Sequence, residues 1–296
     1  MKYAYYPGCS LEHTAKPYDQ SVREVFKALN IELVEIDDWN CCGATMYMSV
    51  NKLVAYAVSA RNLALAQNMG CEICAPCSSC YTILRKTNRF IEWDTYAKER
   101  INEALKAANL SYHKPVEVRH PLDILVNKIG VEKIAEAAPF RLDGLKVAPY
   151  YGCQIVRPVY HFDDLDDPVT MDKLFTALGA EVVPYPGKVR CCGGMLMMTS
   201  EDVALDLNQD LLESAAAYEA DLIVTVCPMC QMNLEAYQPQ INRRFQTSYE
   251  MPILYFTQLL GMALGIDAHK LGIDNLVIPP RRLKLQERDK AGAAAL

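Results

Sequence analysis

The sequence has 296 residues, a hydrophobic content of 51% and a net charge of −6. A chain of this length can bury a sizeable core, and at roughly 100–200 residues per domain it is more typical of two domains than of one. The acidic balance and the lack of a clustered Lys and Arg stripe argue against a nucleic-acid partner, whose phosphates require clustered cations.

The N-terminal segment and the longest apolar run bear on where the chain resides. A cysteine motif begins within nine residues of the N-terminus, which leaves no room for a signal peptide, so we expect a cytoplasmic protein. The longest apolar run, 252–266, falls short of the ~20 residues that a membrane-spanning helix needs, so we expect no membrane span.

The first half of the chain alternates short apolar strands with helices. Residues 3–6 and 31–36 are predicted strands, and a helix with a one-sided apolar stripe begins between them near Pro17. Residues 50–69 are rich in Ala and Leu and predict a second helix. Residues 73–76 end a third predicted strand, and another helix follows it directly. Alternating strands and helices indicate a mainly parallel sheet.

The second half repeats this order. Residues 146–150, 180–184 and 222–226 are predicted strands, and 171–178 carry the same helical apolar stripe as the first helix. Ser200 is a candidate N-cap for a further helix that ends near residue 218. We therefore predict an α/β protein of two duplicated domains, each a mainly parallel sheet flanked by helices, related by a pseudo-twofold axis.

The predicted domains are residues 1–143 and residues 144–296, divided after a helical stretch at 121–138. An acidic insertion at 163–168 is present in the second half alone, and we interpret it as a solvated loop. The charged and small-residue tail, 281–296, is expected to be a loosely held surface segment.

Ten of the twelve cysteines fall into two sets with matching spacing. In each set one cysteine stands more than thirty residues before a Cys-Cys-Gly triplet, and thirty-three residues separate that triplet from a Cys-x-x-Cys pair. The first set is Cys9, Cys41, Cys42, Cys77 and Cys80, and the second set is Cys153, Cys191, Cys192, Cys227 and Cys230. Because functional loops of parallel sheets gather at the carboxyl ends of the strands, the first set should meet at one sheet edge.

Several chemistries can use clustered thiols. A cytosolic chain is not expected to use twelve cysteines as a disulfide framework, so metal binding or redox chemistry becomes the default. Structural zinc takes four ligands, usually as two separated pairs, which suits an adjacent Cys-Cys pair and a fifth thiolate poorly. Vicinal disulfides or plain buried cysteines would not explain two copies of one spacing. Iron–sulfur chemistry suits the count better, although a four-cysteine cubane does not need five ligands.

This cysteine pattern resembles the signature of the cysteine-rich domain family, and two copies in one chain resemble the B subunit of heterodisulfide reductase. The resemblance covers residues 3 to about 266. It implies one noncubane [4Fe-4S] cluster in each half, bound by the two five-cysteine sets. It also implies an oxidoreductase that reduces a disulfide to two thiols, either the coenzyme M–coenzyme B heterodisulfide or a related thiol or persulfide substrate.

The resemblance also implies a mechanism and partners. Each cluster would donate one electron and capture one sulfur, because a thiolate is a strong soft ligand for iron. No flavin or nicotinamide motif is present, so electrons must come from another protein. The expected partners are a ferredoxin-like cubane-cluster subunit of the C type, together with a flavin-containing subunit of the A type. The alternative is an electron-relay or sulfur-oxidation subunit of a related complex, of the succinate or thiol:fumarate or hydroxy-acid dehydrogenase type.

Four further residues are candidates for roles around the clusters. His13 and His120 are candidate proton donors, although a hydrogen-bonded structural histidine is the commoner case. Lys188 and Arg190 precede the second Cys-Cys pair and predict a more positive mouth on that side, suited to an anionic substrate group. Exposed cations of this kind more often only face water.

Cys71 and Cys74 extend the first Cys-x-x-Cys pair into a run that could be taken for a ferredoxin-type cubane site. The internal repeat argues otherwise, because Cys71 aligns with Asp221 and Cys74 with Val224 in the second half. We therefore interpret Cys74 as a buried strand residue that behaves as a small apolar side chain, and Cys71 as a more exposed one.

Overall fold

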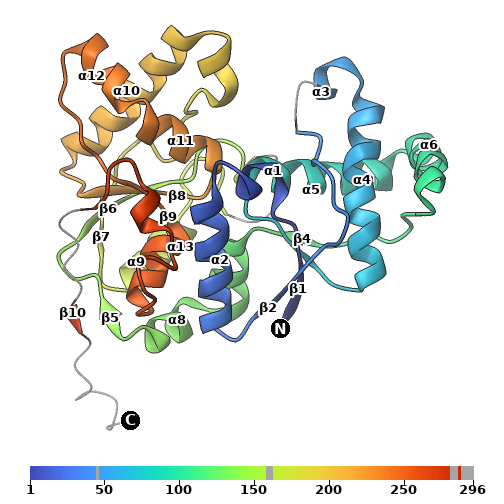
Figure 1. The fold of residues 1–296 in the computed structure, drawn as a ribbon, viewed down its shortest axis with the longest axis horizontal. Coiled ribbons are helices and arrows are strands. Elements are labelled where there is room, and N and C mark those ends of the chain that lie inside the picture. Colours follow the sequence, from blue (N-terminus) through green and yellow to red (C-terminus); the bar gives the residue numbers. More distant parts are fainter. Residues whose placement is uncertain (45–46, 158–162, 281–285, 288–296) are drawn as a thin grey trace.

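The computed structural model describes residues 1–44, 47–157, 163–280 and 286–287. It contains two four-stranded sheets, in which all the neighbouring strands are parallel and the strand order is the same, β2-β1-β3-β4 and β7-β6-β8-β9 (Figure 1). Their strands are β1 (Lys2–Tyr5), β2 (Glu32–Glu35), β3 (Ile73–Cys74), β4 (Val118–Arg119), β6 (Lys146–Tyr150), β7 (Glu181–Val182), β8 (Leu222–Thr225) and β9 (Ile253–Tyr255). The predicted α/β fold with two duplicated parallel sheets is confirmed.

The first three strands of each sheet in chain order were predicted, and the fourth strand of each sheet was not. β4 has only two residues, and β9, although all three of its residues are buried, runs directly into an apolar helix that begins at Phe256. A third, antiparallel sheet pairs β5 (Phe140–Arg141) with β10 (Gln286–Glu287). The expected loosely held tail lies largely outside the described residues, but its short β10 segment is paired.

Helices cover the sheets and connect their strands (Figure 1). The α-helices are α1 (Gly8–Glu12), α2 (Lys16–Ala28), α3 (Tyr47–Val50), α4 (Lys52–Met69), α5 (Ser78–Trp93), α6 (Thr95–Leu105), α7 (Pro121–Asp123), α8 (Val131–Ala137), α9 (Thr170–Ala177), α10 (Glu201–Ala217), α11 (Pro228–Ala236), α12 (Gln238–Phe245) and α13 (Phe256–Ala263). The described residues also form the 3₁₀ segments η1 (Lys106–Ala108), η3 (Gly194–Met198) and η4 (Ile273–Asn275), and the π-helix η2 (Ile124–Ile129). Among the helices of the described residues, none has both the length and the apolar character required to cross a bilayer.

The helix boundaries follow local sequence signals. The buried face of α2 carries Val22, Val25 and Phe26, which recur at helical spacing as predicted. Helix α4 stops at Gly70, whose backbone adopts the left-handed conformation that glycine tolerates best. Ser200 is the N-cap residue of α10, but its side chain makes no capping hydrogen bond.

The two halves share one hydrophobic core. The larger core joins buried residues of the first sheet and its helices to residues of α9 and α13 from the second half, and a smaller core lies within the second half. Helix α2 lies against α13 (Figure 1). The rings of Tyr18 and Tyr255 stack there with centroids 4.2 Å apart, and the buried hydroxyls of Ser21 and Thr257 lie 2.6 Å apart.

Candidate functional site

Both cysteine sets lie where parallel strands end. In the first half, Cys9 lies in α1 directly after β1, the Cys-Cys pair follows β2, and the Cys-x-x-Cys pair follows β3. Cys77 is the N-cap residue of α5, and Cys227 is the N-cap residue of α11. A thiol at a helix N-terminus faces unpaired backbone N–H groups, which favour its thiolate form.

Thiol groups contact one another in an almost continuous chain. In the second half the sulfur of Cys153 lies 3.8 Å from that of Cys191, and the sulfur of Cys192 lies 3.5 Å from that of Cys230. Further pairs of thiols lie close enough to shift each other's pKa, namely Cys9 and Cys41, Cys41 and Cys42, Cys42 and Cys80, Cys80 and Cys77, and Cys227 and Cys230.

The two sets meet at one point. The thiols of Cys77 in the first half and Cys227 in the second half are both buried and lie close enough that each shifts the pKa of the other. These two cysteines occupy equivalent positions in the repeat. The contact places the two candidate sites next to each other across the boundary between the halves.

Contacts between the thiols lower the pKa of some of them and raise the pKa of others. The hydrogen bond with Cys42, followed by the one with Cys9, lowers the pKa of Cys41, and the hydrogen bond with Cys153 lowers the pKa of Cys191 to about 6. The hydrogen bond with Cys230 lowers the pKa of Cys227, but the hydrogen bond with Cys77 and burial outweigh it and raise that pKa to about 11. Such shared protons are easily displaced by a metal that binds thiolates.

Two glycines leave room for the sulfur atoms. Gly8 and Gly152 each precede the first cysteine of their set and have φ angles of +72° and +66°. A Cβ atom at Gly8 would stand 3.1 Å from the sulfur of Cys80, and one at Gly152 would stand 3.0 Å from the sulfur of Cys230. Backbone conformation and close approach therefore both require glycine at these positions.

Two buried tyrosines fix the Cys-Cys loops, and sequence reasoning did not identify them. The hydroxyl of Tyr6 donates to the carbonyl of Asn40 at 2.7 Å, and the hydroxyl of Tyr150 donates to the carbonyl of Arg190 at 2.8 Å. Each carbonyl belongs to the residue directly before the Cys-Cys pair. The signal was present in the repeat, because both tyrosines stand two residues before the glycine of their set.

The residues present fit an iron–sulfur group in donor type and number. Contacts of 3.5 and 3.8 Å between sulfurs are close to the separation of about 3.8 Å expected for two tetrahedral thiolates at about 2.3 Å from one metal. No three Cys, His, Asp or Glu side chains of the described residues converge as the ligands of a single ion would. Five soft thiol donors in each set suit iron–sulfur chemistry.

Cys71 and Cys74 belong to neither five-cysteine set, and their surroundings differ from those of the ten other cysteines. Cys74 lies on β3 with no exposed surface, and burial raises the pKa of its thiol. Cys71 is half-buried, and its thiol donates to the carbonyl of Met69 at 3.5 Å. These positions favour the structural interpretation of both residues.

The two histidines differ in their surroundings. His13 is exposed just after α1. His120 is fully buried, with Nε2 lying 2.7 Å from the carbonyl oxygen of Pro76 and Nδ1 accepting from the backbone N–H of Leu122. Burial lowers the pKa of His120 to about 4. Because the backbone engages both of its ring nitrogens, the geometry favours a structural role for His120 over proton donation.

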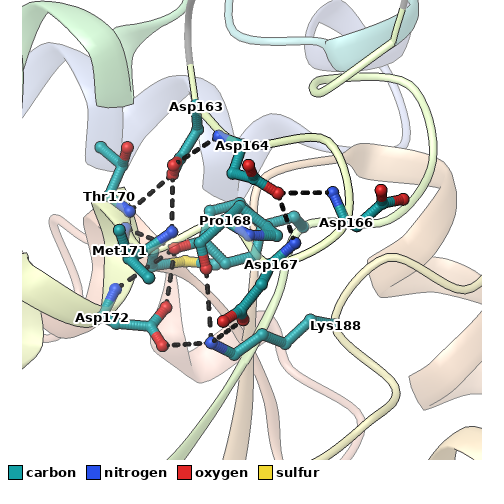
Figure 2. Close-up of polar contacts among 11 residues, drawn as sticks. Asp163, Asp164, Asp166, Asp167, Pro168, Thr170, Met171, Asp172 and Lys188 are labelled. Atoms are coloured by element: carbon teal, nitrogen blue, oxygen red, sulfur yellow. Dashed lines mark hydrogen bonds and ion pairs between the residues drawn. The ribbon is translucent and has the colours of Figure 1, made fainter.

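Lys188 is engaged by carboxylates, as Figure 2 shows. Its Nζ lies 2.5 Å from a carboxylate oxygen of Asp172 and 3.3 Å from one of Asp167, and its side chain is only 12% exposed. Arg190 is 59% exposed and lies 3.9 Å from Asp210. Of the two predicted substrate cations, Arg190 is therefore the one placed to meet a ligand from solvent.

The acidic insertion is a loop whose Asp164, Asp166 and Asp167 are exposed, as expected for a solvated segment, whereas Asp163 is partly buried. Asp163 accepts hydrogen bonds from the backbone N–H groups of Val169 and Thr170, and Asp164 accepts from the two N–H groups that follow Leu165 (Figure 2). These hydrogen bonds from backbone N–H groups to aspartate side chains hold the segment beside Lys188.

A cavity of about 550 Å³ lies beside the first site, and we call it the first mouth. Two of its carboxylates are paired, Glu35 with Arg23 and Asp38 with Arg61. The lining residues are Cys9, Glu12, Glu35, Ile36, Asp37, Asp38, Trp39, Asn40 and Cys41. With four carboxylates and two paired guanidinium groups, the first mouth is acidic, whereas Arg190 stands beside the second site.

Together, the duplicated parallel sheets and the ten edge cysteines define a protein of two cysteine-rich domains. The model of the family described as CCG, cysteine-rich domain, matches residues 3–85 and 147–235, so the chain belongs to this family and contains two copies of its domain.

Three comparisons describe its relatives. The chain is 35% identical over 284 residues to the 8-methylmenaquinol:fumarate reductase membrane anchor subunit of Wolinella succinogenes, covering 95% of this chain and 99% of that protein. It is 30% identical over 278 residues to the B subunit of the ferredoxin:CoB-CoM heterodisulfide reductase of Methanosarcina mazei, covering 92% of each. A crystal structure of a hypothetical protein from Helicobacter pylori superimposes with a TM-score of 0.78 at 15% identity, over 94% of this chain. The chain spans about half of that structure (52%), and this likeness shows the fold alone.

Proposed function

We propose that this protein is the disulfide-reducing subunit of a heterodisulfide reductase-type complex, with one iron–sulfur cluster held by each five-cysteine set. The observation that supports it best is the proximity of the buried thiols of Cys77 and Cys227, which brings the two sets together. Reducing a disulfide consumes two electrons and two protons and yields two thiols. Two adjacent thiolate-rich sites suit a reaction that separates two sulfur atoms.

The proposed ligands are the ten cysteines of the two sets. When bound, the clusters would supply the electrons and soft iron positions for the substrate sulfurs. Five donors in each set exceed the four that a cubane needs, which supports the noncubane [4Fe-4S] type. The chain's own contribution is to hold the thiols in contact, to leave space at Gly8 and Gly152, and to fix the Cys-Cys loops through Tyr6 and Tyr150.

The proposal includes partners and a location. Electrons would come from a ferredoxin-like, C-type subunit with cubane clusters, which would in turn be reduced by a flavin-containing, A-type subunit. The proposed location of the complex is the cytoplasm. The substrate class is a small-molecule disulfide.

A second candidate is a redox subunit of a quinol-linked fumarate reductase. The observation that favours it is the 35% identity over nearly the whole length of the Wolinella succinogenes anchor subunit. The first mouth adds to this, because only two of its four carboxylates are paired with arginines, so its remaining negative charge would repel an anionic disulfide. The pairing of Lys188 with Asp172 also removes one of the two cations expected to attract such a substrate.

The test is anaerobic reconstitution with iron and sulfide, followed by EPR of the protein with candidate disulfides, with thiols and with a menaquinol analogue. A spectrum that changes with a specific thiol or disulfide supports disulfide reduction. Indifference to every thiol, together with cluster reduction by the quinol, would transfer support to the second candidate. Cys191→Ser should alter the spectrum, and Cys71→Ser, outside both sets, is the matched control.

A further inference from the structure

A buried imidazole lies between the backbones of the two cysteine sites. His120 follows β4 directly, and its Nε2 lies 2.7 Å from the carbonyl oxygen of Pro76 and 3.3 Å from that of Val226. Pro76 precedes Cys77, and Val226 precedes Cys227. One side chain therefore reaches the two peptide groups from which the two contacting cysteines emerge.

Three side chains of the first half lie within hydrogen-bonding distance of the carbonyl of Val226. Besides His120, the hydroxyl of Ser78 donates to it at 3.1 Å, and the hydroxyl of Tyr18 donates to it at 3.3 Å. Three groups of the first half thus hold a carbonyl of the second half. All of them are buried, so water cannot replace them cheaply.

The tautomer of His120 follows from its contacts. Nδ1 accepts from the backbone N–H of Leu122 at 3.2 Å, so the ring proton of the neutral imidazole lies on Nε2. That single N–H group faces the carbonyls of both Pro76 and Val226. Aromatic rings limit the tilt of the imidazole, because the centroid of Phe256 lies 6.0 Å away and that of Tyr81 lies 6.1 Å away.

The repeat supplies an internal comparison. Strand pairing matches Ile73 with Val118 in the first sheet and Ile223 with Ile253 in the second, so His120 and Tyr255 are equivalent positions. Tyr255 does something different: its hydroxyl donates to Gln231 at 3.4 Å, and its ring stacks on Tyr18. Of these two equivalent residues, it is therefore His120 that contacts the backbones of both cysteine sites.

We propose that His120 is a positioning residue that sets the distance and orientation of Cys77 relative to Cys227, by holding the carbonyls of Pro76 and Val226 with one N–H group. A carbonyl and the following amide belong to one rigid plane, so a displaced carbonyl moves the cysteine that follows it. That this distance matters for a pair of clusters rests on the proposed function. The effect of His120 on the distance between Cys77 and Cys227 can be tested without that assumption.

The first test measures the spacing in the protein without iron. Diamide takes two electrons and two protons from a pair of thiols and leaves a disulfide, and mass spectrometry of peptides counts each pair. The measured quantity is the ratio of the crosslink between the halves, Cys77–Cys227, to the crosslinks within them, Cys77–Cys80 and Cys227–Cys230. We expect His120→Phe to lower this ratio about fivefold, as the loss of one buried hydrogen bond would.

Two variants separate positioning from general stability. His120→Gln keeps an N–H donor and should retain the ratio within about twofold. Ser21→Ala breaks the buried contact with Thr257 between α2 and α13, away from the cysteine loops, and should leave the ratio unchanged. An unchanged ratio in folded His120→Phe, or an equal fall in Ser21→Ala, would overturn the proposal. If His120→Phe does not fold, Tyr18→Phe removes one donor from the same carbonyl and keeps the stacked ring, and its ratio must fall.

The second test uses the reconstituted protein. The magnetic interaction between the two centres, measured by EPR, should change in His120→Phe and not in Ser21→Ala. Parent protein that takes up no iron would refute the proposed function, while the crosslinking ratio would still decide the role of His120. Iron uptake with an identical interaction in both variants would refute the positioning role.

Discussion

Replacing Lys188 by Ala should destabilise the second half more than it weakens any ligand contact. The lysine Nζ lies 2.5 Å from Asp172, and the two side chains are only 12% and 16% exposed. Breaking a buried ion pair costs about 3–5 kcal/mol, whereas an exposed pair is worth about 0–1 kcal/mol. Asp172 keeps the hydrogen bond from the Tyr151 hydroxyl at 2.7 Å, which reduces the loss to about 2–3 kcal/mol. The pair with Asp167 adds little, because that carboxylate is 79% exposed.

The pH dependence of this effect has a definite sign. Burial lowers the pKa of Lys188, but the hydrogen bond and charge of Asp172 outweigh it, and the pKa is raised. A raised folded pKa means that the stabilisation is fully present below the ordinary lysine pKa of about 10.4 and is lost as the pH rises through the folded value. The deficit of Lys188→Ala should therefore be constant at neutral pH and shrink in strongly alkaline buffer.

Urea unfolding at pH 7 measures the change, and Arg190→Ala is the matched control. Arg190 is 59% exposed, so its removal should cost less than about 0.5 kcal/mol. A double variant, Lys188→Met with Asp172→Asn, should recover part of the loss because it leaves no unpaired charge. If Lys188→Ala is as stable as Arg190→Ala, the ion pair is not structural and the substrate role of Lys188 regains support.

Three further predictions concern the cysteine sites. Cys71→Ser combined with Cys74→Val should retain the iron content and cluster spectrum of the parent, and loss of one cluster's iron would refute the ligand assignment. Gly152→Ala should lower the iron bound by the second set, because the added Cβ would stand 3.0 Å from a sulfur of that set; Gly144→Ala, also at positive φ but with no atom within 4 Å, should not change iron content. Cys192→Ala should remove the iron of the second set and nearly abolish disulfide cleavage, and substantial activity without that cluster would contradict a two-cluster reaction.

Local sequence patterns predicted the elements whose own residues carry a clear apolar period or a repeat. The run that forms β6 has four buried residues in succession, and the stripe of α2 repeats in α9, so period and repetition were sufficient. Strands β4 and β9 were missed for a physical reason. β4 has only two residues and β9 continues directly into the apolar helix α13, and both strands are defined by pairing with β3 and β8, more than twenty residues away.

Spacing alone could gather each cysteine set at a sheet edge, because consecutive parallel strands end at the same edge. It could not predict the contact between Cys77 and Cys227, since that contact depends on how the halves pack. The pairing of Lys188 could not be predicted for a related reason. Its partner Asp172 lies sixteen residues away, on a helix that folds back beside it.

Because of the shared core, the two halves should differ in stability when each is expressed alone. The first site rests on a core completed by α9 and α13 of the second half, whereas the second half has a further core of its own. Residues 1–143 expressed alone would expose Tyr18 and Ser21, which the intact chain buries against Tyr255 and Thr257. Burial of one large side chain is worth about 1.5–3 kcal/mol, so losing several such contacts would remove much of a stability of about 5–15 kcal/mol. We expect the fragment 1–143 to lack a cooperative urea transition and the fragment 144–280 to retain a weaker one. A fragment 1–143 that unfolds cooperatively at the urea concentration of the full chain would show that the first half needs no support from the second.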